Sequence, residues 1–356
     1  RPSKRHKVRD NLLGSPAFCP VVRRTDTEPD SNELRRRVAA IVARFDPDLW
    51  QRASRYLYFK ETRSSFEIER ERPDQRRTVR FVELLSQAGT LVDLDEATLT
   101  ELQHSIVDPR YAEPGFRTEQ NYVGQTIGYS EHVHFVCPKP DDVPGLMTGL
   151  ADCHRRMSES QVDPIVWAAI LSFGFVFIHP FLDGNGRLHR FLIQHVLART
   201  GLGPADAPLP VSATMLAGRK DYDQCLEHFS RPLGSRIDYR LDAEGRMTVR
   251  GETADFYRYF DATRYAHYLG AVVAQTIDQA FLGELEYLQR FDAAWRSLRA
   301  IVDMPDAKMN LFLRLCFGNQ GRLSARKRVS HFGELTDAEI DAMEGVLVDI
   351  LPDSPR

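Results

Sequence analysis

The chain has 356 residues, 42% of them hydrophobic and 27% charged, a balance typical of a globular protein with a substantial core. The formal net charge of −3 gives no overall attraction to nucleic acid or to an anionic membrane. The five cysteines are scattered without a CxxC pair, which argues against a zinc site and a disulfide scaffold and favours a reducing cytosol. No signal peptide is visible, although a chain that opens on Arg1 leaves a removed leader open.

The first part of the chain is predicted to be an arm followed by helices and a hairpin. Residues up to about 30 are basic and rich in Pro, Ser and Asp, which favours a tail or arm. A long helix is predicted over 32–72, ending at Pro73 because proline cannot continue a helix. Within 115–135, β-branched and aromatic residues stand between glycines, which indicates a hairpin. Another helix is expected to begin at Val143.

Two helices are predicted in the middle of the chain. Asp163 and Pro164 combine an N-cap acid with a proline in the first turn, which marks a helix start. The stretch 165–178 is apolar on every side, so this helix is expected to be buried. It is shorter than the roughly 20 residues that span a bilayer. The next helix is predicted to begin at Gly184 or Asn185.

The last part of the chain is expected to be helical apart from a second hairpin. Residues 237–249 have the pattern of two short strands with a turn near 242–245. Thr336 and Glu339 form a capping box that opens a helix. Because neither internal repeats nor a βαβ alternation are evident, the predicted class is mainly α with two small hairpins.

The stretch HPFLDGNGRLHR, residues 179–190, combines features that suit phosphate chemistry. Glycines at a helix N-terminus let backbone N–H groups approach an anion closely, and this end of a helix carries partial positive charge. Arg187 and Arg190, one helical turn apart, add bidentate phosphate donors. Asp183 stands beside this site, and Mg²⁺ is usually held by one or two carboxylates together with phosphate oxygens.

His179 lies just before this anion cradle, where an imidazole could take a proton from an incoming hydroxyl group. Each feature also has an ordinary interpretation, since GNG alone is more often a turn and a histidine before proline is usually a loop residue. Their fixed order within one turn argues against these ordinary interpretations.

The stretch 179–190 resembles the complete signature of Fic-domain proteins, HPFx(D/E)GNGRxxR, with every specified position filled. Residues 115–147 are similar to the family's flap hairpin and the helix after it. Residues 251–270 and 321–340 resemble parts of long bacterial Fic proteins from the cytosol. The resemblance implies a Fic-fold helical bundle with a β-hairpin flap, an N-terminal inhibitory helix and a helical, winged-helix-like C-terminal extension.

The domain organisation that the resemblance implies has three parts. Residues 1–110 form an N-terminal arm and a helical region with the inhibitory motif, residues 111–275 form the catalytic core, and residues 276–356 form a C-terminal helical domain.

The resemblance also implies a chemistry: transfer of AMP from ATP to a Ser, Thr or Tyr hydroxyl of a target protein, with Mg²⁺. His179 would be the general base and Asp183 the Mg²⁺ ligand, while Phe181 packs into the core. The phosphates would be held by the glycine cradle and the two arginines, namely Gly184, Asn185, Gly186, Arg187 and Arg190. Such transfers depend on positioning and charge neutralisation, which these residue types can supply.

Residues 64–70, SSFEIER, are similar to the (S/T)xxxE(G/N) motif of the family's inhibitory helix. Ser65 and Glu69 stand at the specified positions, and Arg70 stands where Gly or Asn is expected. The resemblance implies that Glu69 pairs with Arg190 and takes the guanidinium that the γ-phosphate of ATP needs.

The alternative is that Glu67, Glu69 and Glu71 are solvated charges on an exposed helix. Residues two apart on a helix point in different directions, so only one of the three is expected to reach Arg190.

Other features are less specific. The flap, about residues 121–136, would align a target peptide by strand pairing. His132 and His134 are expected on the surface, because no third metal ligand is evident. Tyr222 resembles a residue that lines the adenine pocket, with an exposed helix start as the alternative. The basic segment 322–328 is interpreted as a solvated turn rather than a nucleic-acid contact.

The sequence therefore predicts a self-inhibited protein adenylyltransferase of the bacterial cytoplasm that uses ATP and Mg²⁺. No membrane or nucleic-acid partner is expected, and the oligomeric state stays open, a homo-oligomer included. One alternative uses the same site to remove AMP by hydrolysis or to transfer another phosphate-containing group. Another is a non-enzymatic adaptor or DNA-binding regulator. A third alternative, an ordinary metabolic nucleotide-binding enzyme, is disfavoured by the lack of a GxxxxGK[ST] loop.

Overall fold

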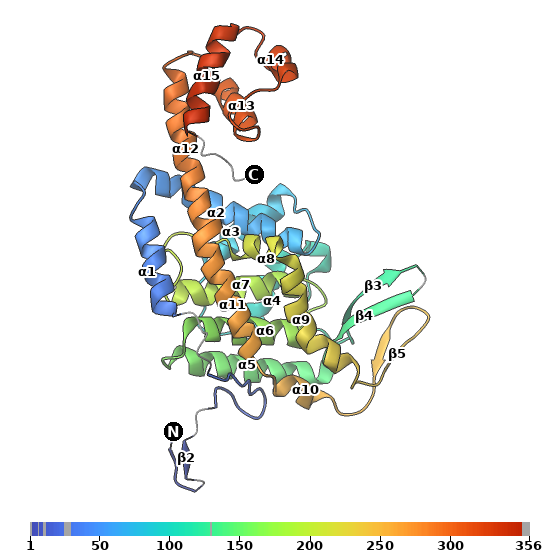
Figure 1. Ribbon diagram of the computed structural model, residues 1–356. Helices are drawn as coiled ribbons and strands as arrows, with labels where there is room; N and C mark the ends of the chain where they lie inside the picture. Colours follow the sequence, from blue (N-terminus) through green and yellow to red (C-terminus); the bar gives the residue numbers. More distant parts are fainter. Residues whose placement is uncertain (1, 6, 10–11, 25–29, 129, 351–356) are drawn as a thin grey trace. The chain divides into compact units, whose positions relative to one another are not determined.

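The computed structural model describes residues 2–5, 7–9, 12–24, 30–128 and 130–350, and it is mainly α-helical, as predicted (Figure 1). The chain divides into two compact units. Unit 1 comprises Arg1–Arg44 and Ser54–Phe281, and unit 2 comprises Phe45–Ala53 and Leu282–Arg356. The border expected at residue 110 lies within unit 1, and the border expected at residue 275 lies close to the division after Phe281.

The N-terminal arm is partly packed onto unit 1. Strands β1 (Pro2–Ser3) and β2 (Val8–Arg9) pair with each other. The Phe18 side chain is buried against Gly149 of α5 (Val143–Ser158), where an added Cβ would lie 2.7 Å from the Phe18 Cβ. The segment around Phe18 is therefore part of the core and not a free tail. Residues 1, 6, 10–11 and 25–29 of the predicted arm lie outside the described residues.

The single helix predicted over 32–72 is wrong, because the structure has α1 (Ser31–Val42) and α2 (Pro47–Ile68) in its place. A proline disfavours helical backbone at the residue before it, which here is Asp46. The Asp46 side chain then accepts a hydrogen bond from the Leu49 N–H in the first turn of α2. Pro47 could have predicted this break from the sequence, but the apolar periodicity on either side of it favoured one continuous helix.

The predicted flap hairpin is confirmed, with shorter strands. After α3 (Gln75–Ser86) and α4 (Glu96–Ile106), strands β3 (Tyr122–Ile127) and β4 (Ser130–Val136) pair antiparallel. The register shifts between Val123 and Gly124, which is a bulge. Residue 129, between the two strands, lies outside the described residues.

The centre of unit 1 is the buried helix α6 (Pro164–Ile178), which packs on α5, α7 (Asn185–Arg199) and α11 (Thr263–Gln275). The Asp163 side chain caps α6 as predicted, accepting hydrogen bonds from the backbone N–H groups of the first turn. Because α6 is covered on nearly every side, its C-terminal end and the loop to α7 are held in a fixed place.

The remaining elements of unit 1 surround this core. Helix α8 (Val211–Ala217) is followed by α9 (Arg219–Gly234), which packs on β4 of the flap. The second predicted hairpin is confirmed as β5 (Tyr239–Leu241) with β6 (Met247–Val249). Helix α10 (Ala254–Arg258) precedes α11, and a π-helical turn, Thr276–Phe281, ends the unit.

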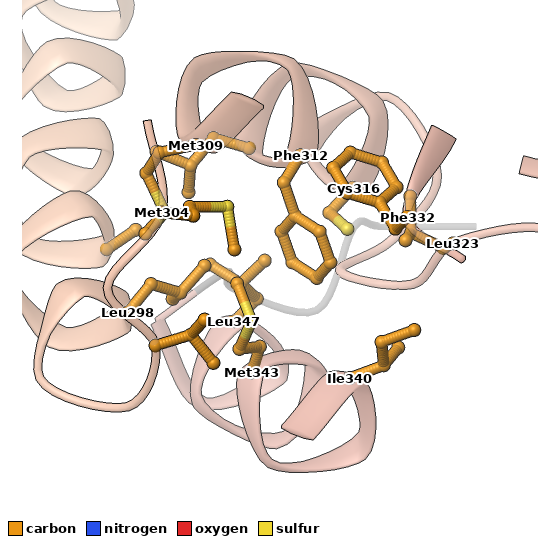
Figure 2. Packing of buried hydrophobic residues seen from close by; sticks show 13 residues of the cluster. Leu298, Met304, Met309, Phe312, Cys316, Leu323, Phe332, Ile340, Met343 and Leu347 are labelled. Atoms are coloured by element: carbon orange, nitrogen blue, oxygen red, sulfur yellow. The ribbon is translucent and has the colours of Figure 1, made fainter. Parts of the chain in front are cut away.

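The C-terminal part of unit 2 is helical, as predicted, and consists of α12 (Leu282–Arg299), α13 (Asp306–Phe317), α14 (Ala325–His331) and α15 (Asp337–Ile350). Their buried faces form the apolar core in Figure 2, with Phe312 and Phe332 at a centroid distance of 5.2 Å. Residues 282–350 contain no strand, so the described region lacks the wing of a winged helix.

Thr336 opens α15, and Arg328 lies in the basic segment before it. The capping box is confirmed, because the Thr336 N–H donates to Glu339 and the Glu339 N–H donates to the Thr336 hydroxyl. In the basic segment 322–328, Arg328 is used inside the unit, where it pairs with Asp341 and Glu344 at 3.0 and 2.8 Å. One cation of the segment is therefore a structural residue.

Candidate active site

His179 stands at the C-terminal end of α6 in the left-handed conformation, with φ 53° and ψ 58°. Its ring Nδ1 lies 3.1 Å from the Val176 carbonyl oxygen. A carbonyl oxygen only accepts, so Nδ1 carries the proton and Nε2 keeps its lone pair. Burial, partly offset by the bond to Val176, lowers the pKa of His179 to about 4. The imidazole is therefore neutral near pH 7 and can accept a proton at Nε2.

The loop after His179 is closed by the Asn185 side chain. Its Oδ1 accepts a hydrogen bond from the Phe181 N–H at 3.1 Å, and its Nδ2 donates to the Phe181 carbonyl at 2.7 Å. Phe181 is buried edge-on against Phe116, as predicted for this position. The expectation that Asn185 holds phosphate now applies only to its backbone N–H, because its side chain holds the loop.

A carboxylate that the sequence did not single out also supports this loop. Oε1 of Glu113 accepts hydrogen bonds from the Leu182 N–H at 2.8 Å and from Gln103 Nε2 at 3.2 Å. Burial raises the pKa of Glu113. No local pattern marks Glu113, since its partners lie 69 and 10 residues away in the chain.

The glycines of the signature leave room for an anion at the start of α7. Gly184 has a φ of 90°, a backbone conformation that favours glycine. At Gly186 an added Cβ would lie 2.2 Å from Oε1 of Glu69. The first N–H groups of a helix lack partners within the helix. The Glu69 carboxylate therefore lies where the cradle would receive an anion.

Arg190 is almost fully buried, with 1% of its side chain exposed, and faces α2. Its Nε donates to the Ser65 hydroxyl at 2.8 Å, and its Nη2 donates to the Ser65 carbonyl and to Oε1 of Glu69, each at 2.8 Å. The predicted pairing of Glu69 with this arginine is thus present in the structure, and Ser65 adds two hydrogen bonds that the sequence did not predict.

The charge on Glu69 is maintained by its neighbours. Burial acts to raise its pKa, but Arg190, Arg187 and Arg219 act in the opposite direction, and the net pKa is lowered. The side chain still has 36% of its surface exposed. Glu69 is therefore an ionised carboxylate that solvent can reach.

Arg187 is equally buried and is held from three sides. Its Nη2 lies 2.8 Å from Oδ1 of Asp183 and 3.2 Å from Oε1 of Glu71, and its guanidinium carbon lies 5.1 Å from the centroid of the Phe66 ring. Arg187 Nε and Arg190 Nη1 are buried and have no hydrogen-bond partner among the described residues. Each arginine therefore keeps a buried donor that a ligand could satisfy.

A face of α2 that is polar at four-residue intervals lies against α7. Glu61 and Ser65 of α2 and Glu69, which follows directly after it, recur at i, i+4 and i+8. Glu61 is buried and accepts hydrogen bonds from the Ser212 N–H at 2.9 Å and from Gln194 Nε2 at 2.9 Å. Burial raises its pKa to about 7. Glu61 is not among the residues predicted from the sequence, although its spacing from Ser65 was a usable signal.

Arg70, which stands where the inhibitory motif has Gly or Asn, adopts a left-handed backbone conformation. Arg70 has a φ of 58° just after α2, and the Glu71 N–H donates to the Phe66 carbonyl while the Arg70 N–H donates to the Glu67 carbonyl. This is a Schellman motif, in which the left-handed residue is usually Gly or Asn. The Gly or Asn of the family motif would fit this geometry, and arginine adopts it at a cost of about 1–2 kcal/mol.

The three glutamates of this segment have different partners. Glu67 pairs with Arg63 at 2.9 Å on the surface, and only Glu69 contacts Arg190. Glu71, however, lies on Arg187, which the sequence analysis did not anticipate. Residues two apart point in different directions only within a helix. The Schellman turn at Arg70 changes the direction of the chain before Glu71, so this rule does not place the Glu71 side chain.

Tyr222 is buried beside Arg190 and is not at an exposed helix start. Its ring is nearly parallel to those of His189 and Tyr268, with centroid distances of 6.1 and 6.2 Å. Burial raises the pKa of Tyr222 to about 12, so the hydroxyl stays protonated. Its role in binding adenine remains a prediction.

Asp183 fits a cation shared with phosphates. Its side chain is 48% exposed, and its Oδ1 accepts from Arg187 and from the Gly184 N–H. Within the described ranges no group of three or more His, Cys, Asp or Glu side chains could hold a metal ion. A cation here would take most of its ligands from substrate and water, as Mg²⁺ commonly does. His132 and His134 are exposed on the flap, as predicted.

Comparison with known proteins agrees with this geometry. Residues 93–197 match the model of the Fic/DOC family, and the chain therefore contains a Fic domain. It is similar to protein adenylyltransferase Fic of Drosophila willistoni, with 38% identity over 120 residues, which are 33% of this chain and 22% of that protein. It is also similar to protein adenylyltransferase fic-1 of Caenorhabditis elegans, with 31% identity over 138 residues, 38% of this chain and 25% of that protein. The aligned part of the chain spans only about a quarter of the length of these curated relatives.

Solved structures show the same fold over more of the chain. A Fic family protein from Desulfovibrio desulfuricans G20 has a TM-score of 0.51 at 19% identity, covering 94% of this chain and 96% of that chain. A Fic-domain signalling protein from Bacteroides thetaiotaomicron VPI-5482 has a TM-score of 0.51 at 18% identity, covering 72% and 96%. Among the described residues, no helix combines the length and apolar character needed to cross a membrane.

Proposed function

We propose that this protein is a self-inhibited adenylyltransferase that moves AMP from ATP to the hydroxyl group of a protein side chain. The observation that carries the proposal is the place of Glu69, whose carboxylate lies against Gly186 and on Arg190 at once. A carboxylate seated in an anion cradle marks where phosphate oxygens would bind. The same carboxylate would keep the γ-phosphate from Arg190.

The nucleotide would be held by this chain's backbone and arginines. The N–H groups that open α7 would face the phosphates, and the unsatisfied donors of Arg187 and Arg190 would receive oxygens. Asp183 would hold Mg²⁺ together with phosphate oxygens, and a bound Mg²⁺ would offset the charge that builds on the leaving pyrophosphate. Tyr222, buried beside Arg190, is the proposed contact on the adenine side.

In the proposed transfer the target's hydroxyl oxygen attacks the α-phosphorus of ATP, and the bond from that phosphorus to the bridging oxygen breaks. Pyrophosphate leaves, and the hydroxyl proton moves to Nε2 of His179. The neutral state of His179, with Nδ1–H directed at Val176, supports this role.

The flap is the proposed docking element for the target. β3 is a strand with exposed side chains, and β4 packs on α9, so β3 is the edge that an extended peptide could join. Serine, threonine and tyrosine targets are equally compatible with this backbone pairing. The buried free cysteines fit a reducing compartment, and we place the protein in the bacterial cytoplasm.

The experiment is incubation of wild type, Glu69→Gly and His179→Ala with ATP labelled on the α-phosphate, followed by intact-mass measurement. A mass gain of AMP that rises in Glu69→Gly and is lost in His179→Ala supports the proposal. Calorimetry is the control, because His179→Ala should keep its ATP affinity.

The rival reaction at this site gives a different result in the same assay. Loss of AMP from a protein that already carries it would support removal by hydrolysis, with Glu69 positioning the water. Absence of any AMP gain in Glu69→Gly, with its ATP affinity intact, would reject the transferase.

A further inference from the structure

Arg117 is a buried cation for which the described residues provide no ion pair. Only 3% of its surface is exposed. Its Nε donates to the His179 carbonyl at 2.8 Å, its Nη1 to the Glu119 carbonyl at 2.8 Å and its Nη2 to the Pro138 carbonyl at 2.6 Å. Every nitrogen of the guanidinium group is thus bonded to backbone oxygen.

The three carbonyls belong to segments that need to be held together. Glu119 lies just before β3 and Pro138 just after β4, so two of the bonds hold the two ends of the flap. The third bond holds the backbone of His179, and the Arg117 N–H adds a bond to the Pro180 carbonyl at 2.8 Å. One residue therefore ties both ends of the flap to the loop that carries the proposed base.

The energetics argue that this arrangement is more than packing. Removing a guanidinium from water costs several kcal/mol in general, and the hydrogen bonds to the three carbonyls offset this cost only because all three lie within reach of one group. The three fixed donors of arginine can join three separate carbonyls, which the single nitrogen of lysine cannot reproduce. Arg117 also lies at the C-terminal end of α6, where the helix dipole favours a cation.

The guanidinium also acts on the charge of the imidazole. Arg117 favours the neutral form of His179, while Glu69, just after α2, and Asp183 from the loop favour the charged form. Removing the cation should therefore raise the pKa of His179.

We infer that Arg117 is a positioning residue that couples the flap to His179, so that a target strand on the flap and the proposed base keep a fixed relation. This inference deepens the proposed function and rests on it. A displacement of about 1 Å between reacting groups can cost roughly 100-fold in rate, which is the reason for a rigid link.

The coupling itself can be tested without any reaction. Amide hydrogen exchange of the full chain is compared between wild type, Arg117→Gln, Arg117→Lys and the control Arg110→Gln, which removes an exposed arginine close by in sequence. Both Arg117 variants should exchange about tenfold faster in peptides from 119–138 and from 179–184 together. Faster exchange in only one of the two segments, or equally fast exchange in Arg110→Gln, overturns the coupling.

The role in the reaction is then measured in the Glu69→Gly background. Each Arg117 variant should lower kcat by about 100-fold while the KM for ATP stays within about twofold. Arg117→Gln should also move the acid limb of the pH–rate profile to higher pH, and Arg117→Lys, which keeps the charge, should not.

A fall in ATP affinity parallel to kcat, or a loss that only follows the folded fraction in thermal melts, overturns the positioning role. If the Glu69→Gly parent itself transfers no AMP, the proposed function fails, and hydrogen exchange still decides whether the flap and His179 are coupled.

Discussion

Glu69 and Gly186 approach each other so closely that a single methyl group could not stand between them, since a Cβ on Gly186 would lie 2.2 Å from Oε1 of Glu69. The carboxylate thus lies in the space that the glycine leaves open at the start of α7. In the proposed function this is the space that a phosphate of ATP would occupy.

Removing that anion should raise activity. A hydrogen bond to a charged group contributes about 1.5–3 kcal/mol, so Glu69→Gly is expected to raise AMP incorporation roughly tenfold to hundredfold. The measurement is label incorporation from ATP. Arg190→Ala in the same background should be inactive, because the arginine would also bind the γ-phosphate.

Glu67 and Glu71 provide matched comparisons for the Glu69 variant. Glu67→Gly should leave incorporation unchanged, since Glu67 pairs with Arg63 on the surface. Glu71→Gly should give a smaller rise than Glu69→Gly, because Glu71 lies 3.2 Å from Arg187. Equal incorporation in wild type and Glu69→Gly would reject the inhibitory role.

Arg70→Gly should strengthen inhibition. Glycine adopts the φ of 58° at this position without the strain of a side chain, which is worth about 1 kcal/mol. A raised Tm and lower basal incorporation are expected. Arg70→Ala is the control, because alanine carries the same strain and should match wild type in both measurements. Similar behaviour of the glycine and alanine variants would show that the Arg70 backbone does not limit the inhibited state.

Asp183→Ala should lose nearly all activity and its dependence on Mg²⁺. The half-exposed carboxylate lies one residue before the cradle, where it can share a cation with the phosphates. The measurement is a Mg²⁺ titration of incorporation in the Glu69→Gly background. An unchanged titration curve would exclude Asp183 as a ligand.

Glu61 should make stability depend on pH. Its pKa is raised from the ordinary 4.5 to about 7 in the folded protein, so the folded state keeps the proton at pH values where the unfolded chain has lost it. The contribution of Glu61 to the free energy of unfolding is therefore fully present below pH 4.5. It falls by on the order of 3 kcal/mol as the pH rises to about 7. Thermal melts between pH 4.5 and 8 give the pH dependence of Tm for wild type and for Glu61→Gln. The part of this dependence that comes from Glu61 should be absent in the variant.

Local signals were enough to predict much of this fold. Asp163 and Pro164 mark the start of α6 because capping depends on neighbouring residues only, and the order of the signature marks the start of α7. The interruption at Asp46 was also local, but a long apolar period on both sides favoured one continuous helix.

The contacts that position the site could not be predicted in the same way. Arg117 meets the His179 carbonyl 62 residues away, and Glu61 meets Ser212 151 residues away. Backbone carbonyls leave no trace in a sequence, so an arginine that binds three of them looks like any other. The place of Glu71 depends on the turn at Arg70, which helical spacing does not describe.

The hydrogen bonds between Asn185 and Phe181 are made while Glu69 still occupies the cradle. In the proposed function the loop would therefore not have to be rebuilt when ATP arrives, whereas Glu69 and the turn that carries it would have to move. Exposed side chains change rotamer in picoseconds to nanoseconds, whereas local unfolding of a turn takes microseconds to seconds, so the turn is the slower of the two. In the proposed function, activation would therefore be limited by the release of this turn and by the arrival of the ligand that displaces Glu69, and not by the building of the loop.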